Sequence, residues 1–198
     1  MKAVWSIVIV FVLSVHAWSQ DWMMALNYNI AVPGKKMQSF INNPSLLGFS
    51  LDARKMVTPH LSIGGSFGQQ LFYWQTGSSL GIEQPAFIGS QIRFMNAFPL
   101  MINLHVYLGD SSRLRPYAGM NMGGFYAWQR SEMGVLVVEG RKWQWGVAPE
   151  IGAIFPVGRV DMTMAAKLNC IGCPRVSSVM DEAHQLYFSF NVGMIFYK

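Results

Sequence analysis

Residues 185–197 have the sequence Gln-Leu-Tyr-Phe-Ser-Phe-Asn-Val-Gly-Met-Ile-Phe-Tyr, and this stretch decides the fold. Every second residue is apolar: Leu186, Phe188, Phe190, Val192, Met194 and Phe196. Between them stand the mostly polar or small residues Gln185, Tyr187, Ser189, Asn191 and Gly193. Because successive side chains of a strand point to opposite faces, the pattern predicts a strand with one apolar and one polar face. Such a strand is typical of a barrel wall between lipid and a polar lumen.

The composition also indicates a surface that is largely not in contact with water. The 198 residues are 52% apolar and only 13% charged, whereas a soluble domain carries about 25% charged residues. After the first 19 residues, no stretch approaches the roughly 20 apolar residues of a membrane-spanning helix. Two hypotheses remain, a dense soluble β-fold and a β-barrel in an outer membrane. Lys and Arg are scattered and the formal net charge is only +5, so no nucleic-acid partner is expected.

The start of the chain is typical of a cleavable signal peptide. Lys2 gives a positive start, residues 4–15 are apolar, and residues 17–19 form a small-x-small cleavage motif. A retained anchor helix is the alternative. We therefore expect residues 1–19 to be a signal peptide and residues 20–198 to form one barrel domain.

The same alternation recurs along the chain. It predicts eight strands, at residues 23–32, 47–57, 61–74, 86–108, 115–129, 142–155, 159–168 and 185–197. The connections between them alternate between long and short: 35–44, 58–60, 75–85, 109–114, 130–141, 156–158 and 169–184. Outer-membrane barrels have long outside loops and short periplasmic turns. The predicted fold class is all-β, a closed eight-stranded antiparallel up-and-down transmembrane β-barrel.

The two faces of these strands decide between a membrane barrel and a soluble one. The outward aromatic residues gather near strand ends, as interfacial belts do: Tyr73, Phe94, Tyr126, Trp128, Trp143, Trp145 and Phe196. A soluble barrel of the lipocalin type would carry its apolar face inside. Here the charged residues share a face with glycine and asparagine, opposite the aliphatic residues, which favours the membrane barrel.

Four stretches resemble the small outer-membrane β-barrel family of Bacteroidota (outer membrane protein beta-barrel domain): residues 41–54, 61–68, 115–123 and 145–152. The resemblance covers nearly the whole mature chain, and its motifs build the barrel wall. It implies insertion by the barrel-assembly machinery, which recognises a C-terminal strand ending in an aromatic residue. Here Tyr197 is followed by Lys198, so the chain departs from that pattern by one residue.

The predicted inward face carries charges of both signs. They are Asp52, Glu150, Asp161, Arg54, Arg93 and Lys167. Eight strands enclose a space just wide enough for side chains to fill. One hypothesis is a salt-bridged network that fills the lumen. The other is a narrow selective channel, which would need a water path past Arg93, Tyr117 and Met101.

No catalytic, metal-binding or cofactor-binding residue is predicted, and no cofactor is expected. Histidine is the usual residue of acid–base catalysis, but His60, His105 and His184 have no Ser or Asp partner at a motif spacing. Cys170 and Cys173 fall in a predicted outside loop, where a disulfide is favoured over free thiols or a metal site.

The predicted long loops contain apolar residues, namely Met37, Phe40, Ile41, Leu80, Ile82 and residues 135–138. They either fold back over the barrel mouth or form a partner surface. We therefore expect an integral outer-membrane protein, surrounded by lipid, that acts as a non-enzymatic structural or accessory scaffold. Its extracellular loops would bind a protein or a surface. A small porin-like channel is the second hypothesis, and a membrane enzyme at the barrel mouth is the third.

Overall fold

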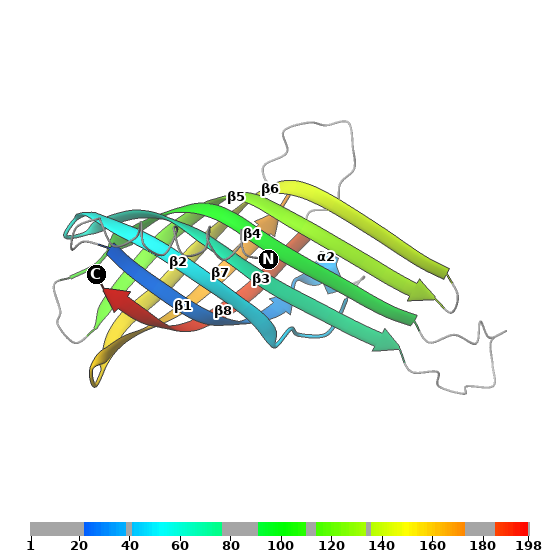
Figure 1. Ribbon diagram of the computed structural model, residues 1–198, viewed down its shortest axis with the longest axis horizontal. Coiled ribbons are helices and arrows are strands. Elements are labelled where there is room, and N and C mark those ends of the chain that lie inside the picture. Colours follow the sequence, from blue (N-terminus) through cyan, green and yellow to red (C-terminus); the bar gives the residue numbers. More distant parts are fainter. Residues whose placement is uncertain are drawn as a thin grey trace, which may run out of the picture.

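The computed structural model describes residues 22–38, 41–76, 91–109, 114–133, 136–172 and 185–197. The expected signal peptide, residues 1–19, lies outside the described residues. Eight strands form a closed antiparallel barrel in which each strand pairs with its neighbours in sequence and β8 pairs with β1 (Figure 1). This confirms the barrel predicted from the alternation. No helix of the described residues is long and apolar enough to cross a membrane.

The strand bounds follow the prediction closely at most positions. The elements are β1 (Trp22–Pro33), α2 (Lys35–Gln38), β2 (Leu47–Thr58), β3 (Leu61–Thr76), β4 (Gln91–Tyr107), β5 (Arg115–Met133), β6 (Leu136–Val157), β7 (Val160–Ile171) and β8 (Gln185–Tyr197). Strand β8 has the predicted bounds. Its register with β1 runs from Met23 opposite Tyr197 to Pro33 opposite Tyr187, so the ladder is closed along the whole of β8 except its first two residues.

The two ends of the barrel differ in shape. At one end, which we call the turn end, short connections join β2 to β3, β4 to β5 and β6 to β7, and β1 begins and β8 ends there. At the other, the loop end, β3 to β6 extend well beyond β1, β2, β7 and β8 (Figure 1). Strand β7 ends at Ile171, opposite Gly146, whereas β6 begins at Leu136. We call residues 125–133 and 136–144, which pair with each other beyond the end of β7, the projecting hairpin.

The projecting hairpin corrects one prediction. The prediction of a long loop at residues 130–141 is wrong, because all the described residues of this range belong to β5 or β6. Arg130 lies opposite Glu139 in the register, and their side chains form an ion pair of 3.3 Å. Arg130 also pairs with Glu132 at 2.6 Å. The ladder between β5 and β6 continues through this stretch, so a run of charged residues does not by itself mark a loop.

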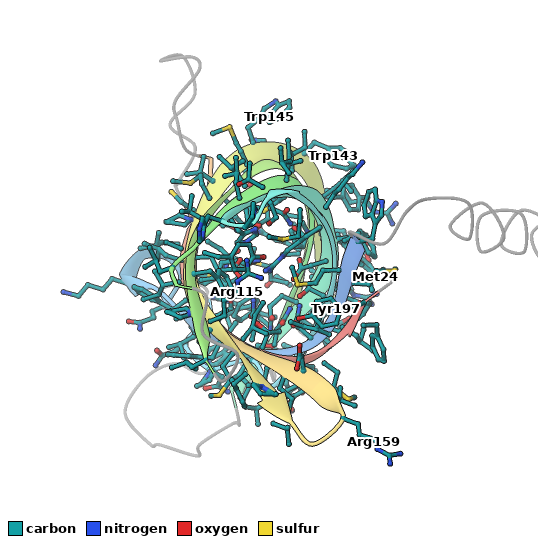
Figure 2. The ribbon with its side chains drawn as sticks, turned by 90° about the vertical axis from the view of Figure 1, so that its left-hand side faces the viewer. Met24, Arg115, Trp143, Trp145, Arg159 and Tyr197 are labelled. Carbon is teal, nitrogen blue, oxygen red and sulfur yellow. The ribbon has the colours of Figure 1, made fainter. Side chains whose placement is uncertain are left out.

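Side chains alternate between the two faces as predicted. Exposed apolar residues cover the outside of the strands, among them Leu51, Ile63, Leu104, Met122, Ile151, Met164, Phe190 and Met194. Polar and charged residues fill positions of the inward face, including Asn27, Asp52, Arg54, Asn121, Glu150 and Lys167, all buried. Figure 2 shows Trp143 and Trp145 pointing away from the wall. The barrel therefore has an apolar exterior and an interior in which ionised groups are enclosed.

Candidate functional site

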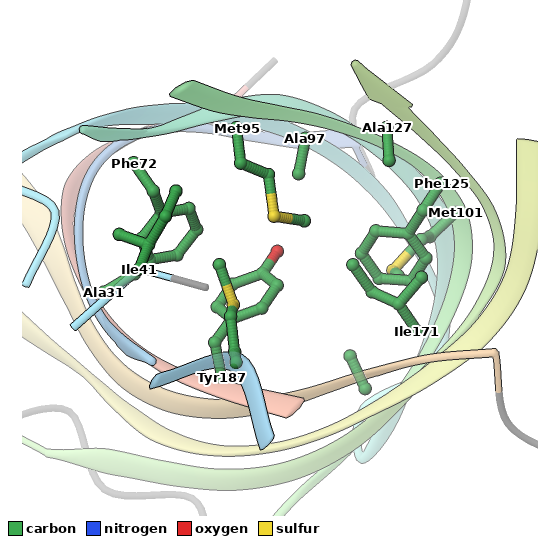
Figure 3. Close-up of a cluster of buried hydrophobic side chains, with 12 residues drawn as sticks. Ala31, Ile41, Phe72, Met95, Ala97, Met101, Phe125, Ala127, Ile171 and Tyr187 are labelled. Atoms are coloured by element: carbon green, nitrogen blue, oxygen red, sulfur yellow. The ribbon is translucent and has the colours of Figure 1, made fainter. Parts of the chain in front are cut away.

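The lumen is filled by side chains in three layers along the barrel. An apolar cluster lies toward the loop end (Figure 3), made of Ala31, Met37, Ile41, Phe72, Met95, Ala97, Met101, Phe125, Ala127, Ala148, Ile171 and Tyr187. A second apolar cluster lies toward the turn end, made of Met23, Ala25, Tyr107, Tyr117, Ile154, Ala165 and Ile195. Between them lies a polar network centred on Glu150. The network is thus held between two apolar layers.

The connection between β1 and β2 closes the loop end of the lumen. Helix α2 starts after Gly34, whose carbonyl oxygen accepts bonds from the Met37 and Gln38 amides at 2.8 and 3.0 Å. The Ile41 amide then donates to the Met37 carbonyl at 2.8 Å. This turn directs Met37 and Ile41 into the loop-end cluster, where both are buried. These two residues therefore fold back into the mouth, while Phe40, Leu80 and Ile82 lie outside the described residues.

Glu150, on β6, is the hub of the polar network. Its Oε1 accepts a hydrogen bond of 2.8 Å from the Tyr117 hydroxyl and lies 3.4 Å from Arg54 Nη2. Its Oε2 lies 3.1 Å from Lys167 Nζ and accepts a bond of 3.0 Å from Asn121 Nδ2. A buried carboxylate is costly unless it is paired and hydrogen-bonded. Both oxygens of Glu150 meet that condition, with four donors contributed by three different strands, β2, β5 and β7.

Arg54 connects this hub to a second carboxylate. Its Nη2 lies 3.4 Å from Asp52 Oδ2, two residues earlier on the same face of β2. The same Asp52 oxygen accepts a bond of 2.7 Å from Asn27 Nδ2 on β1. The Arg54 guanidinium carbon also lies 5.1 Å from the centre of the Tyr117 ring. The negative charges of the two carboxylates are therefore balanced inside the barrel by the positive charges of Arg54 and Lys167.

The structure brings together four of the six charged residues predicted to line the lumen, namely Asp52, Arg54, Glu150 and Lys167. It places Arg93 toward the loop end, with its guanidinium carbon 5.2 Å from the centre of the Trp74 ring. It places Asp161 beside Tyr197 at the turn end. Asp161 is six residues from Lys167 along β7, about 20 Å at the rise of a strand. Alternation predicts on which face of a strand a residue lies, but it does not predict the position of that residue along the barrel axis.

The sequence did not single out His105 as part of this network. Its Nε2 lies 3.6 Å from Glu150 Oε2, and its ring meets the Tyr117 ring edge-on at 5.3 Å. The contacts of His105, Tyr117 and Asn121 with Glu150 depend on the stagger of β4, β5 and β6, which alternation along a single strand does not give. His105 is fully buried, so this imidazole does not face a substrate-sized opening.

A small polar cavity lies beside the network. It measures about 30 Å³, and Ser50, Ser66, Lys167, Ser189 and Asn191 are among the residues that line it. That is room for about one or two water molecules. Among the described residues, no group of three or more His, Cys, Asp or Glu side chains is arranged to hold a metal ion.

Cys170 lies near the end of β7, opposite Val147 of β6 and Leu186 of β8. It is disulfide-bonded. Cys173 lies outside the described residues, so the pairing of Cys170 with Cys173 stays a prediction. The contacts described for Glu150 do not include Cys170.

The fold is shared with known barrels, although the sequence matches none of them closely. No family model matches this chain, and no curated protein matches it. Ail, the attachment invasion locus protein of Yersinia pestis, solved in complex with the heparin analogue sucrose octasulfate, superposes with a TM-score of 0.51 at 10% identity, covering 90% of this chain and 100% of that chain. Neisserial surface protein A (NspA) superposes with a TM-score of 0.53 at 12% identity, and the match covers 88% of this chain and 95% of that chain. At such identities the likeness establishes the barrel fold alone.

Replacing Glu150 with glutamine tests the network. Glu150→Gln leaves Arg54 and Lys167 facing a neutral amide, and losing one partner of a buried ion pair costs about 3–5 kcal/mol. We expect the free energy of unfolding, from urea titration in lipid vesicles, to fall by that amount. The matched control Glu139→Gln breaks ion pairs on the exposed hairpin and should cost about 1 kcal/mol or less.

A second variant separates charge compensation from packing. Adding Lys167→Met to Glu150→Gln removes one uncompensated cation, so the double variant should recover part of the lost stability. Equal losses for Glu150→Gln and Glu139→Gln would contradict the role of Glu150 as a hub.

Proposed function

We propose that this chain is an integral protein of a bacterial outer membrane, with the barrel wall in lipid and the turn end in the periplasm. The observation that carries the proposal is the ring of exposed apolar side chains around a charged interior. Monomeric soluble proteins rarely expose contiguous apolar patches of more than a few hundred Å². Leu51, Ile63, Leu104, Ile151 and Phe190 lie on five different strands, so the apolar surface runs around the barrel. Lipid is the solvent that suits such a surface.

Aromatic and charged residues at the two ends support this placement. Toward the loop end, Tyr73 packs against Phe94 at 5.0 Å and Tyr126 against Trp143 at 5.3 Å. Phe196 is exposed toward the turn end. Aromatic belts of this kind mark the two interfaces of membrane barrels. Exposed charges lie beyond the belts, in the projecting hairpin and in the turn that holds Arg159 (Figure 2).

Within that membrane we propose a non-enzymatic scaffold whose working surface is the loop end. The packed lumen argues against a pore, and the burial of His105 argues against catalysis there. The loop end instead offers the projecting hairpin, on which Val137 and Val138 are exposed. The complex of Ail with sucrose octasulfate is a precedent for a barrel of this fold that binds a ligand. Membership of the Bacteroidota family and insertion by the barrel-assembly machinery stay predictions.

A pair of arginine substitutions tests the membrane location. Ile102 is 68% exposed on β4, five residues from the end of that strand at the turn end, and Leu46 is 59% exposed at the loop end. Arginine on the lipid face costs about 2–4 kcal/mol near the bilayer midplane and about 0–1 kcal/mol near an interface. We therefore expect Ile102→Arg to lower the free energy of unfolding in vesicles and to reduce recovery in the outer-membrane fraction, whereas Leu46→Arg should change neither. A water-facing wall would tolerate both substitutions equally.

Conductance in planar bilayers separates the scaffold from the channel. Side chains of the two apolar clusters and of the Glu150 network occupy the described part of the lumen, so we expect the purified barrel to give no current steps above leak. Reproducible single-channel steps that change size in Met101→Ala or Phe125→Ala would contradict the scaffold and favour the channel, because those variants widen the loop-end cluster.

A further inference from the structure

The outer wall contains a groove on the face formed by β4, β5 and β6. It has a volume of about 530 Å³, and its lining includes Leu100, Ile102, Met122, Gly124, Trp143 and Trp145. This volume is within the roughly 300–1,000 Å³ of small-ligand pockets. The two tryptophans, 63% and 71% exposed, stand out from the wall (Figure 2). The groove therefore opens into the apolar belt, away from the lumen.

Gly124 creates the groove. In the register it lies between Leu100 and Trp145, so the middle position of that outward row has no side chain. A Cβ at Gly124 would stand 3.1 Å from Cζ3 of Trp143, so the indole already leans over the vacant position. The next row toward the turn end is filled by Ile102, Met122 and Val147. The result is an apolar slot with a glycine floor and an indole wall.

A cation lies on the same face beyond the groove. Arg141 is two residues from Trp143 toward the loop end, about 7 Å at the rise of a strand. Its guanidinium carbon is 5.5 Å from the centre of the Trp128 ring, and its Nη2 is 3.8 Å from Glu139 Oε2. That distance is longer than the two ion pairs of Arg130 on the same hairpin, 2.6 and 3.3 Å. An arginine fork, with five N–H donors, suits a phosphate.

We propose that this groove binds a phosphate-bearing acyl lipid of the surrounding bilayer, with one acyl chain in the slot and the phosphate on Arg141. The proposal rests on the membrane location proposed above. The order of the groups along the barrel matches that of the lipid: an apolar slot, then the interfacial pair Tyr126 and Trp143, then the cation. Tryptophan and tyrosine prefer the interface, where the glycerol region of a phospholipid lies. The complementary charge of Arg141 favours a phosphate-bearing lipid over a neutral one.

Native mass spectrometry of the purified barrel in a nonionic detergent tests this proposal with two probes. Dioleoylphosphatidylglycerol has the phosphate, and dioleoylglycerol has the same chains without it. The wild-type chain should retain one phosphatidylglycerol preferentially. Gly124→Leu fills the slot and should weaken binding of both lipids, about tenfold for phosphatidylglycerol, or about 1.4 kcal/mol. Arg141→Gln should weaken phosphatidylglycerol alone and leave dioleoylglycerol unchanged.

Two further variants make the result decisive. Trp145→Ala opens one wall of the slot at a highly exposed position and should also weaken both lipids, so it decides the matter if Gly124→Leu does not fold. Met120→Leu keeps an apolar residue on the same face outside the groove and should bind as the wild type. An unchanged affinity for phosphatidylglycerol in Trp145→Ala, or an equal loss in Met120→Leu, would overturn the groove. If Arg141→Gln weakened the binding of phosphatidylglycerol and of dioleoylglycerol equally, the proposed contact between Arg141 and the phosphate would be wrong.

These outcomes are distinct from a failure of the membrane location. If the Ile102→Arg and Leu46→Arg pair behaves as expected while the groove variants bind lipid like the wild type, the groove proposal is wrong and the membrane location stands. If both arginine variants are tolerated equally, the membrane location fails first.

Discussion

Closure of the hydrogen-bonded ladder between β1 and β8 is the constraint on which the rest of the structure depends. In a bilayer, an open strand edge would leave amide and carbonyl groups without partners. Closing the sheet removes that edge and fixes which face of every strand points outward. Once the outward face is apolar, the polar side chains of the same strands must meet inside. The charge compensation around Glu150 is thus a consequence of closure, because an enclosed carboxylate needs both cations and neutral donors.

Because the interior is filled by side chains, contacts with other molecules must be made by the outer surfaces of the barrel. Apolar clusters toward each end of the lumen, one of them completed by Met37 and Ile41, enclose the polar layer. What remains for interaction is the loop end, where the projecting hairpin carries its own ion pairs, and the outer wall, where Gly124 leaves a groove between Leu100 and the two tryptophans. Each of these surfaces arises from a local departure from the regular strand pattern.

Much of the fold could be predicted from the sequence, because a period of two is a strong signal when one face is wholly apolar. The bounds of β8 and the inward direction of Asp52, Arg54, Glu150 and Lys167 follow from it. The contacts among these residues could not be predicted, since they depend on the stagger between strands. Arg93 and Asp161 lie on the same inward face of their strands, but at positions along the barrel axis that differ from that of the Glu150 network. The prediction of a loop at residues 130–141 is wrong because these residues are rich in charge and lack apolar alternation, although the ladder between β5 and β6 continues through them.

The most direct test of the account is the environment of successive positions along β8. Nitroxide labels would be placed singly at cysteines introduced at residues 188 to 192 and at residue 194, in a chain with Cys170→Ser and Cys173→Ser, reconstituted in lipid vesicles. Collision rates with oxygen and with a water-soluble nickel chelate report lipid and water respectively. A wall embedded in lipid predicts high oxygen collision at Phe188, Phe190, Val192 and Met194 and low collision with both reagents at the positions between them. High nickel collision at those four positions would contradict it.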